Sequence, residues 1–345
     1  FIIYSMKILN AFLKLFFLMI AILPSNSYAI NTECVVLLYH HFSDDAPKST
    51  STSPELFNKH LEFLKKNDYQ VLPLKKVIES LKTKQNLPEK CVSLTADDGF
   101  LSFYNEAFPL LSYYQFPMSV FLSTEPVDKK YASMMSWDQL REMSHLVDVF
   151  NHSRRHLHLI NKNIKTLEEE IYFAQDRILK ELGVNDKIFA YPYGEFDNNT
   201  YSFLRSSGYT AFGQQSGVAS QTSDFLNIPR FSMSGPYAEM DSFSLKVRTL
   251  HMPIKKYSPK NLIISDDFKP VLEIDFLRRL SSYEKVNFSC FVSDQGRAKL
   301  EWMGSESVRV KSKDPISIGR TRYNCTMPSK EKGRYYWFSK LWLRQ

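Results

Sequence analysis

Glycine is scarce in this sequence, with 11 residues among 345, and the chain contains no internal repeat or low-complexity tract. Fibrous and disordered chains depend on such biased compositions, so the sequence disfavours both classes. Hydrophobic residues account for 43% of the chain, which is typical of a globular protein with an ordinary core. The length is sufficient for one large domain and a smaller one.

Long apolar runs are also lacking near the N-terminus, where the apolar stretch Leu15–Leu23 is too short to cross a bilayer comfortably. Two lysines precede this stretch and Pro24 follows it, with Ser27 and Ala29 placed for cleavage after Ala29. Residues 1–29 are therefore predicted to comprise upstream residues and an export signal, with an uncleaved anchor as the alternative. We expect an exported protein of the periplasm, the outer envelope or the medium, without a stable transmembrane span after cleavage.

Cysteine is limited to four residues. Cys34 and Cys91 each open an apolar strand-like run, at equal distances from the polar residues that end those runs. If the two strands are parallel neighbours, the two cysteines lie at the same level and can form a disulfide, which an exported protein would retain. Cys290 and Cys325 form the natural second pair, and four buried free thiols are the alternative.

The formal net charge of +7 is distributed unevenly. Residues 1–257 hold 27 basic and 27 acidic side chains, whereas residues 258–345 hold 17 and 10. This asymmetry indicates two domains with different partners. In an exported protein, the basic C-terminal domain would face an acidic envelope surface rather than nucleic acid, and a merely solubilising surface is the alternative.

Between residue 34 and about residue 250, apolar strand-like runs alternate with segments of helical periodicity. Typical strands cover 34–40, 90–96, 116–123 and 146–152, and typical amphipathic helices cover 53–67 and 165–182. Repeated β–α alternation predicts an α/β domain over residues 30–255, with a parallel sheet that is either a barrel or doubly wound. In both folds the chemistry gathers where the strands end.

The pattern changes over residues 256–345, where runs of alternating polarity predict six short strands and an antiparallel sandwich. The predicted strands are 271–276, 285–293, 298–303, 307–312, 320–327 and 334–344. The order Cys290, Trp302, Tyr323, Cys325 is similar to that of immunoglobulin domains. The two cysteines are only 35 residues apart, so we predict an immunoglobulin-like sandwich rather than a true immunoglobulin domain.

Three short polar stretches lie at the ends of predicted strands. They are TADDG at 95–99, NHSRRH at 151–156 and AYPYG at 190–194. In the second, His152 and His156 are four residues apart, so both imidazoles can face one point if the chain turns helical after the strand. Two imidazoles and one carboxylate form a three-ligand set that leaves metal positions open for water and substrate.

The adjacent aspartates of the first stretch then have separate roles. One of Asp97 and Asp98 can bind the metal, whose charge offsets their repulsion, while the other stays free as a base. Alone, a DDG stretch is more often a turn, and histidines four residues apart are more often structural. The three stretches together, each at a strand end, indicate a metal centre.

These stretches resemble the T-F-D-D-G, H-[ST]-x-x-H and R-x-P-[FY]-G motifs of the polysaccharide deacetylases, also called the NodB-homology family or carbohydrate esterase family four. The resemblance covers about residues 34–255. It implies a distorted (β/α) barrel that hydrolyses the acetamide groups of a sugar polymer. In this chain the small all-β immunoglobulin-like sandwich would follow that barrel.

The resemblance also implies roles for individual residues. It implies a divalent metal, zinc by default, with three ligands: Asp98, His152 and His156. Asp97 would be the general base. The backbone N–H of Tyr193, beside Gly194, would help hold the oxyanion.

One departure from the family pattern concerns an arginine. Ala190 occupies the place of the family arginine, which normally pairs with the base aspartate. An unpaired Asp97 beside Asp98 should have a raised pKa. We therefore hypothesise that Arg230, at a later predicted strand end, supplies the missing guanidinium.

The general acid has three candidates. His251, in TLHMP, looks like the late L-H motif of the family, whereas His40 and His41 end the first strand and resemble the Y-H-H of the poly-N-acetylglucosamine deacetylase branch. Because strand residues alternate sides, only one of the adjacent pair can point inward, and we favour His40. A hydrogen-bonded core histidine is the alternative for His40.

The sequence therefore predicts an exported, metal-dependent N-deacetylase that acts on N-acetylglucosamine units of an envelope or extracellular polymer. The sequences of the YHH and FAYPYG stretches favour a β-1,6-linked polymer. Two alternatives stay open: a non-catalytic glycan-binding or scaffold protein on a degenerate barrel, and a metal amidase that acts on a non-sugar amide.

Overall fold

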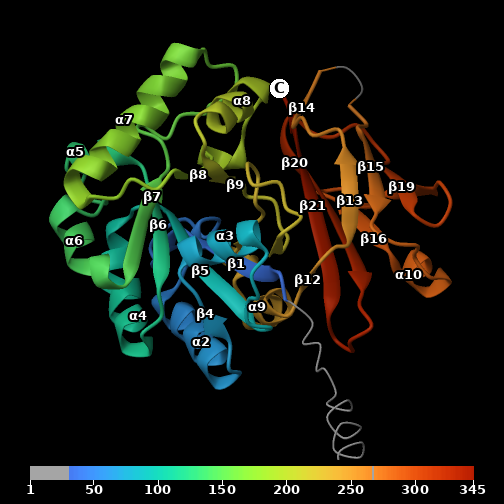
Figure 1. The fold of residues 1–345 in the computed structure, drawn as a ribbon, viewed down its shortest axis with the longest axis horizontal. Coiled ribbons are helices and arrows are strands. Elements are labelled where there is room, and N and C mark those ends of the chain that lie inside the picture. Colours follow the sequence, from blue (N-terminus) through green and yellow to red (C-terminus); the bar gives the residue numbers. More distant parts are fainter. Residues whose placement is uncertain (1–30, 266–267) are drawn as a thin grey trace, which may run out of the picture. The chain divides into compact units, whose positions relative to one another are not determined.

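The apolar strands of the first region assemble into one curled sheet in the computed structural model, which describes residues 31–265 and 268–345 (Figure 1). The spatial order is β10 (Ala219–Ser220), β1 (Glu33–Tyr39), β5 (Cys91–Asp98), β6 (Met118–Leu122), β7 (Val147–Asn151), β8 (Ile188–Ala190) and β9 (Thr210–Phe212). Two further strands join it, β4 (Gln70–Val71) beside β5 and β11 (Phe231–Ser232) beside β1. The predicted export signal, residues 1–29, lies outside the described residues.

Neighbouring strands of this sheet run parallel, except that β10 is antiparallel to β1. Ile228 forms a parallel bridge with Phe212 of β9, and the residues that follow pair with β1 through β11. The segment 228–232 therefore reaches both edges of the curled sheet. The predicted mixed α/β architecture of this region is confirmed.

Helices connect the strands and lie around the outside of the sheet (Figure 1). They are α2 (Pro54–Lys66), α3 (Leu74–Thr83), α4 (Phe108–Tyr114), α5 (Thr124–Asp128), α6 (Trp137–Glu142), α7 (Ile164–Leu182), α8 (Asn198–Ser206) and α9 (Met240–Val247). Shorter elements are β2 (His41–Phe42), β3 (Ser51–Thr52), the π-helical turn η1 (Phe103–Ala107) and the 3-10 turns η2 (Met143–His145), η3 (Pro192–Gly194) and η4 (Gly235–Tyr237). Within the two described ranges, no helix combines the length and apolarity that a bilayer crossing requires.

Helix α7 shows how the local sequence sets an element. The Asn163 side chain accepts a hydrogen bond from the Thr166 N–H at its start, and Gly183 ends it in a left-handed conformation with φ 72°. Its buried apolar residues recur at helical spacing and form one stripe: Leu167, Ile171, Ala174 and Ile178. This stripe packs the helix against the sheet.

The two faces of β5 have different surroundings, and this difference positions the site. Val92, Leu94 and Ala96 belong to the core cluster on one face, together with residues of α2 and α4. Alternation along a strand places Ser93, Thr95 and Asp97 on the opposite face, and all three are fully buried. A strand that is apolar on one face and polar on the other thus carries Asp97 into the interior at its carboxyl end.

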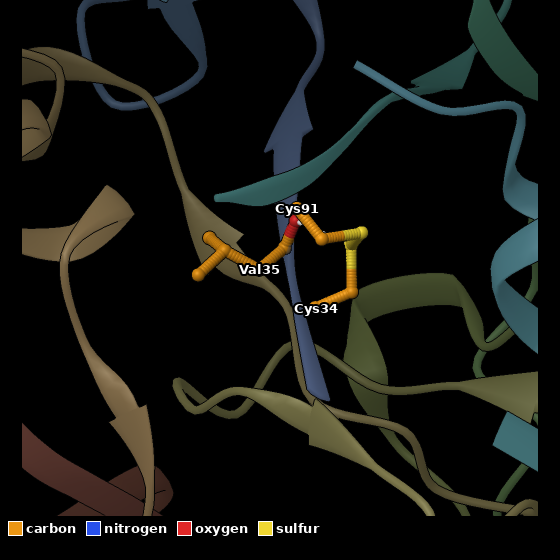
Figure 2. Close-up of a disulfide and its surroundings, with 3 residues drawn as sticks. All are labelled: Cys34, Val35 and Cys91. Atoms are coloured by element: carbon orange, nitrogen blue, oxygen red, sulfur yellow. Dashed lines mark hydrogen bonds between the residues drawn. A yellow bond between two sulfur atoms is a disulfide. The ribbon is translucent and has the colours of Figure 1, made fainter. Parts of the chain in front are cut away.

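Both predicted disulfides are present. Cys34 and Cys91 join the neighbouring strands β1 and β5 with 4.8 Å between their Cα atoms, and Figure 2 shows the bond across the two strands. The parallel register, in which Val35 lies opposite Val92, places the two cysteines at one level, as the sequence predicts. The bond between Cys290 and Cys325 lies in the C-terminal region.

Removal of the first disulfide is expected to destabilise the protein. The bond closes a loop of 57 residues, and the lost constraint on the unfolded chain corresponds to about 4 kcal/mol. We expect the double variant Cys34→Ala/Cys91→Ala to lower the free energy of unfolding by roughly this amount in urea titrations. The double variant Cys290→Ala/Cys325→Ala, which removes the other disulfide, is the comparison, and an unfolding midpoint that Cys34→Ala/Cys91→Ala does not shift would contradict the cross-link.

The C-terminal region consists of two β-sheets that share one core. One sheet has the order β12 (Leu250–His251), β21 (Tyr335–Arg344), β20 (Gly319–Pro328), β16 (Ser289–Val292) and β17 (Gly296–Arg297), with β14 (Ile263–Ile264) beside β21. The other has the order β13 (Ile254–Ser258), β15 (Val271–Phe276), β19 (Ser307–Lys311) and β18 (Lys299–Trp302). Most neighbours are antiparallel, so the predicted antiparallel β-rich region is confirmed.

Two details of this region differ from the sequence-based prediction. Cys290 and Cys325 lie directly opposite each other on adjacent strands of one sheet, whereas the immunoglobulin disulfide joins two sheets. The predicted strand 285–293 begins instead with helix α10 (Ser282–Asn287). Ser281 and Glu284 form a reciprocal capping box there, which starts a helix and overrides the alternating pattern.

The β-rich region packs directly on the α/β domain. Strand β12 pairs with β21, and the Trp337 ring of β21 lies edge-on to Phe231 of β11 with 5.5 Å between centroids. Leu341 of β21 is buried in a core cluster that also contains Phe189 and Tyr191. Residues 32–345 consequently form one compact unit.

Candidate active site

The carboxyl end of β5 carries the two adjacent aspartates into a tight turn. Asp98 has φ 76° and Gly99 has φ 92°, and the Gly99 N–H donates to the Asp97 carbonyl at 3.0 Å. A Cβ at residue 99 would overlap the Leu122 side chain, so this turn requires glycine. The turn leaves Asp97 fully buried and places Asp98 at the edge of the sheet, with its side chain 18% exposed.

The two histidines of the second stretch follow β7, two strands along the sheet. The helical turn that would bring both rings to one point is not what forms here, because Ser153 with φ 67° and His156 with φ 57° are left-handed. Asn151 Oδ1 accepts from the Ser153 N–H at 2.9 Å, and Ser153 Oγ accepts from the His156 N–H at 3.0 Å. These side-chain bonds take the place of a helical turn and bring the rings of His152 and His156 to 4.9 Å between centroids.

Asp98, His152 and His156 converge on one point. Asp98 Oδ1 lies 3.4 Å from His152 Nε2 and 3.2 Å from His156 Nε2, and the three ligand atoms all lie within 4.8 Å of one another. Asp98 Oδ1 and His152 Nε2 are buried without a hydrogen-bond partner, which a bound cation would explain. The Nδ1–H of His152 donates to the Ala190 carbonyl at 2.8 Å, which leaves the Nε2 lone pair free for a metal.

The electrostatics of these three residues fit a divalent cation. Burial lowers the pKa of His156 to about 4, so its imidazole is neutral at pH 7, as a ligand must be. Burial would raise the pKa of Asp98, but His152, His40 and His156 together outweigh it and hold the pKa well below its usual range. Burial would lower the pKa of His152, yet the charges of Asp97 and Asp98 raise it, so this point attracts positive charge.

Arg230 lies against Asp97, in the position that the sequence-based hypothesis requires. Arg230 Nη1 donates to Oδ1 at 2.6 Å and Nη2 donates to Oδ2 at 2.8 Å, and both side chains are fully buried. The Arg230 Nε donates to the Gly213 carbonyl at 3.0 Å, which fixes the plane of the guanidinium. Burial would raise the pKa of Asp97, but Arg230, together with the charges of His152 and His40, outweighs this effect and lowers the pKa.

Loss of this guanidinium is expected to change the pH dependence of activity. In an Arg230→Met variant the buried Asp97 carboxylate has no partner, so its pKa rises by about 1–3 units. A carboxylate that acts as general base must be ionised, so if Asp97 has this role the acid limb of the kcat/KM profile moves to higher pH and turnover at neutral pH falls, with metal content unchanged. Arg177→Met is the matched control, since Arg177 forms a similar fork on Asp128 at the surface. An acid limb at the wild-type pH would contradict the role of Arg230.

The structure separates the two adjacent histidines of the first strand. His40, at the end of β1, has a buried Nδ1 without a hydrogen-bond partner. Burial lowers its pKa, while the charges of Asp97 and Asp98 oppose this change, so the ring lies within their field. His41 instead stacks on Phe100 with 3.5 Å between ring centroids. Of the pair, His40 is the one with an unpaired nitrogen near the aspartates.

His251, the third candidate for the general acid, is not brought to this site. Its Nδ1–H donates to the Val218 carbonyl at 2.9 Å, and its Nε2 lies 3.0 Å from Thr222 Oγ1. Its backbone N–H donates to Glu33 Oε2 at 3.0 Å. Glu33 begins β1, whereas the aspartates end the parallel strand β5. His251 therefore lies at the amino ends of these strands, and the aspartates lie at their carboxyl ends.

The third stretch forms a strained turn after β8. Tyr193 has φ 60°, and its ring lies edge-on to His156 with 4.6 Å between centroids. Gly194 has φ 71°, and a Cβ there would lie 2.9 Å from the Gln214 backbone nitrogen, so the chain passes too closely for any other residue. Non-glycine residues with positive φ at all three stretches are typical of a functional site.

Two residues near the site are absent from the sequence-based prediction. Glu195 Oε2 accepts from His158 Nδ1 at 2.6 Å, and the His158 ring stacks on Tyr193 with 3.9 Å between centroids. Arg320 of β20 donates to the Tyr193 carbonyl from 127 residues away. Glu195 directly follows the third stretch, so its position in the sequence could have indicated that it lies near the site. Nothing in the sequence connects Arg320 to this turn.

The fold and the site together define a class of enzyme. A parallel sheet that presents an Asp–His–His ligand set beside a buried, arginine-paired aspartate is typical of hydrolases that activate water at a metal.

Comparison with known proteins identifies the family. The polysaccharide deacetylase family model matches residues 84–212. The poly-β-1,6-N-acetyl-D-glucosamine N-deacetylase of Staphylococcus epidermidis is 27% identical over 202 residues, which cover 54% of this chain and 69% of that protein. The protein of the same name from Escherichia coli K12 is 25% identical over 242 residues, which cover 57% of this chain. The Streptococcus pyogenes deacetylase PplD, solved with acetate, has a TM-score of 0.59 at 23% identity, over 64% of this chain and 99% of its own.

Residues 84–212 therefore form a domain of the polysaccharide deacetylase family, whose members are hydrolases that act on amide bonds. The chain spans 36% of the length of the Escherichia coli relative. The family match ends at residue 212, before the β-rich region begins.

Proposed function

We propose that this protein is an exported, metal-dependent N-deacetylase that hydrolyses the acetamide of N-acetylglucosamine units in an envelope or extracellular polymer. The observation that carries this proposal is the buried Asp97–Arg230 pair beside the convergent Asp98, His152 and His156. A base held ionised next to a cation site is the arrangement that hydrolysis of an unactivated amide requires.

The ligand set would hold one divalent metal, zinc by default for two imidazoles and a carboxylate. When bound, such an ion polarises an amide carbonyl and lowers the pKa of water. Other residues of the chain would accept and return protons and stabilise the developing charge. Asp97 lies with Oδ2 3.9 Å from His152 Nε2, so it is placed to accept a proton from a water beside the ligand cluster.

The charge that develops on the substrate oxygen needs a donor that is fixed in advance. We assign this role to the backbone N–H of Tyr193, in the turn that Gly194 permits. His40 would return a proton to the leaving amine, because its buried Nδ1 has no hydrogen-bond partner and the charges of Asp97 and Asp98 partly offset the lowering of its pKa by burial. His251 has no part in this scheme.

The location and the polymer are inferred from the disulfides, the charge distribution and the names of the relatives. Two disulfides support an oxidising compartment outside the cytoplasm. The names of relatives that act on poly-β-1,6-N-acetyl-D-glucosamine support a β-1,6-linked substrate. Residues 258–345, which carry more basic than acidic side chains, would hold the enzyme near an acidic envelope surface.

An acetate-release screen tests the proposal. Purified protein with bound zinc is incubated with β-1,6- and β-1,4-linked N-acetylglucosamine oligomers of equal length, and Asp97→Asn serves as the inactive control. We expect acetate from the β-1,6 oligomers at the higher rate, and none above background from the variant. Metal-loaded protein that binds an oligomer but releases no acetate would favour a glycan-binding role, and acetate from non-sugar amides alone would favour a different amidase.

A further inference from the structure

Strand β20 of the β-rich region reaches the turn after β8, beside the candidate metal ligands. Arg320 Nη1 donates to the Tyr193 carbonyl at 2.8 Å, and Arg320 Nε lies 3.6 Å from Glu195 Oε1. The guanidinium carbon also lies 6.0 Å from the centroid of the Tyr193 ring. One side chain of the β-rich region therefore contacts the residues on both sides of Gly194.

From these contacts we propose that Arg320 is a positioning residue for the Tyr193–Gly194 turn, so that the β-rich region completes the active site of the α/β domain. The inference rests on the proposed function, because it concerns the backbone N–H to which the oxyanion is assigned. Arg320 does not contact the reacting atoms itself, and its effect passes through Tyr193 and Glu195.

The turn needs such support because its backbone conformation is unfavourable. A tyrosine with φ 60° lies in the left-handed region, which persists only when surrounding contacts determine it. Inside the turn, the Gly194 N–H donates to the Tyr191 carbonyl at 2.9 Å. The hydrogen bond from Arg320 fixes the Tyr193 carbonyl and hence the peptide plane after Tyr193. The plane before Tyr193, which carries its N–H, joins this plane at the Tyr193 Cα, and its Pro192 carbonyl accepts a hydrogen bond from the N–H of Glu195 at 3.2 Å, so contacts of Arg320 with Tyr193 and Glu195 bear on both planes.

A second set of contacts runs from Arg320 towards the ligand cluster. Glu195, the partner of Arg320 Nε, accepts a hydrogen bond from His158 at 2.6 Å. The His158 ring lies parallel to the Tyr193 ring, with 8° between their planes. Tyr193 in turn lies edge-on to His156. His156 is held independently by its N–H bond to Ser153 Oγ, so we expect metal binding to survive a change at Arg320.

Arginine suits this position better than lysine does. The guanidinium is planar and donates in fixed directions from several nitrogens, so it can bond to a carbonyl and face a carboxylate at once. The ladder between β20 and β21, in which Arg320 lies opposite Leu343, fixes the base of the side chain. A lysine at this position could contact only one of the two partners, so it should rescue activity only in part.

The test compares Arg320→Met, Arg320→Lys and the control Arg309→Met, which removes an exposed arginine of β19 that pairs with Glu273. For Arg320→Met we expect kcat for acetate release to fall by about 10- to 100-fold, with KM, zinc content and melting temperature close to wild type. Arg320→Lys should be intermediate, and Arg309→Met should match the wild type. In the metal-free protein, amide hydrogen exchange should become faster in peptides covering residues 190–197 of Arg320→Met, and not in those covering 91–99.

A wild-type kcat in Arg320→Met would overturn the inference. A loss of activity that is fully explained by lost zinc, by lost stability or by a raised KM would also overturn it. Unchanged hydrogen exchange over residues 190–197 in Arg320→Met would overturn it as well. Parallel assays with 4-nitrophenyl acetate, an activated ester that needs an oxyanion donor but no polymer, separate this result from the proposed substrate. If the wild-type protein hydrolyses the ester but no oligomer, the proposed function is refuted. The role of Arg320 is then still tested, by comparing kcat for the ester and hydrogen exchange between the wild type and Arg320→Met.

Discussion

Asp97→Asn is expected to lower turnover by about three orders of magnitude, the range that general-base catalysis spans, while the protein still binds its metal. The amide of asparagine has nearly the shape of the carboxylate but cannot accept the proton of the attacking water. Asp98, His152 and His156 keep their positions, so the ligand cluster stays complete. Acetate release and zinc content, measured on the same preparation, check both parts of this prediction.

The variant also leaves the buried guanidinium of Arg230 without a counter-charge, which typically costs about 3–5 kcal/mol of stability. The assay is therefore run well below the melting temperature of the variant, with the folded fraction verified by circular dichroism. Asp138→Asn is the matched control, because the Asp138 side chain is 90% exposed and pairs only with a surface arginine. Turnover within tenfold of wild type in folded Asp97→Asn would exclude Asp97 as the base.

Asp98→Asn is expected to abolish metal binding at stoichiometric zinc, whereas Asp97→Asn is expected to keep its metal. The only carboxylate of the cluster supplies the negative charge that faces the cation, and an amide oxygen is a much weaker ligand. Since loss of a mere supporting contact costs 10- to 100-fold in affinity, loss of a ligand should cost more than about 100-fold. Isothermal titration of the metal-free protein with zinc measures this change directly.

The same substitution at Asp241, an exposed residue in the first turn of α9, is the control for Asp98→Asn. We expect Asp241→Asn to bind zinc like the wild type. If folded Asp98→Asn retained wild-type zinc affinity, the cluster of Asp98, His152 and His156 would not be the metal site.

The parts of the fold and site that were predictable from sequence depend on local pattern and on strand order. Apolar runs between helical segments indicate parallel strands, and the carboxyl ends of such strands meet at one edge. That geometry explains why three separate stretches could be assigned to one site. The Cys34–Cys91 bond was predictable for the same reason, because parallel register aligns residues at equal distances from strand ends.

Other features depend on tertiary contacts that leave no local signal. His251 lies in a short pattern that resembles a family motif, but β12 joins β21 and carries it to the amino end of β1. The left-handed turn of His152 to His156 is set by hydrogen bonds that Asn151 Oδ1 and Ser153 Oγ accept, so the two rings converge without the helical turn that their spacing suggested. Arg320 reaches its partner only through the packing of two regions, which periodicity cannot reveal.

The central claim is that Asp98, His152 and His156 hold one metal that deacetylation of a polymer requires. It is tested most directly by measuring zinc content and acetate release from a β-1,6-linked N-acetylglucosamine oligomer on one preparation, before chelation, after chelation and after zinc is restored. We predict one zinc ion per chain, loss of acetate release with the metal, and recovery in proportion to the zinc bound. Acetate release that continues at the original rate in the metal-free protein would contradict the claim.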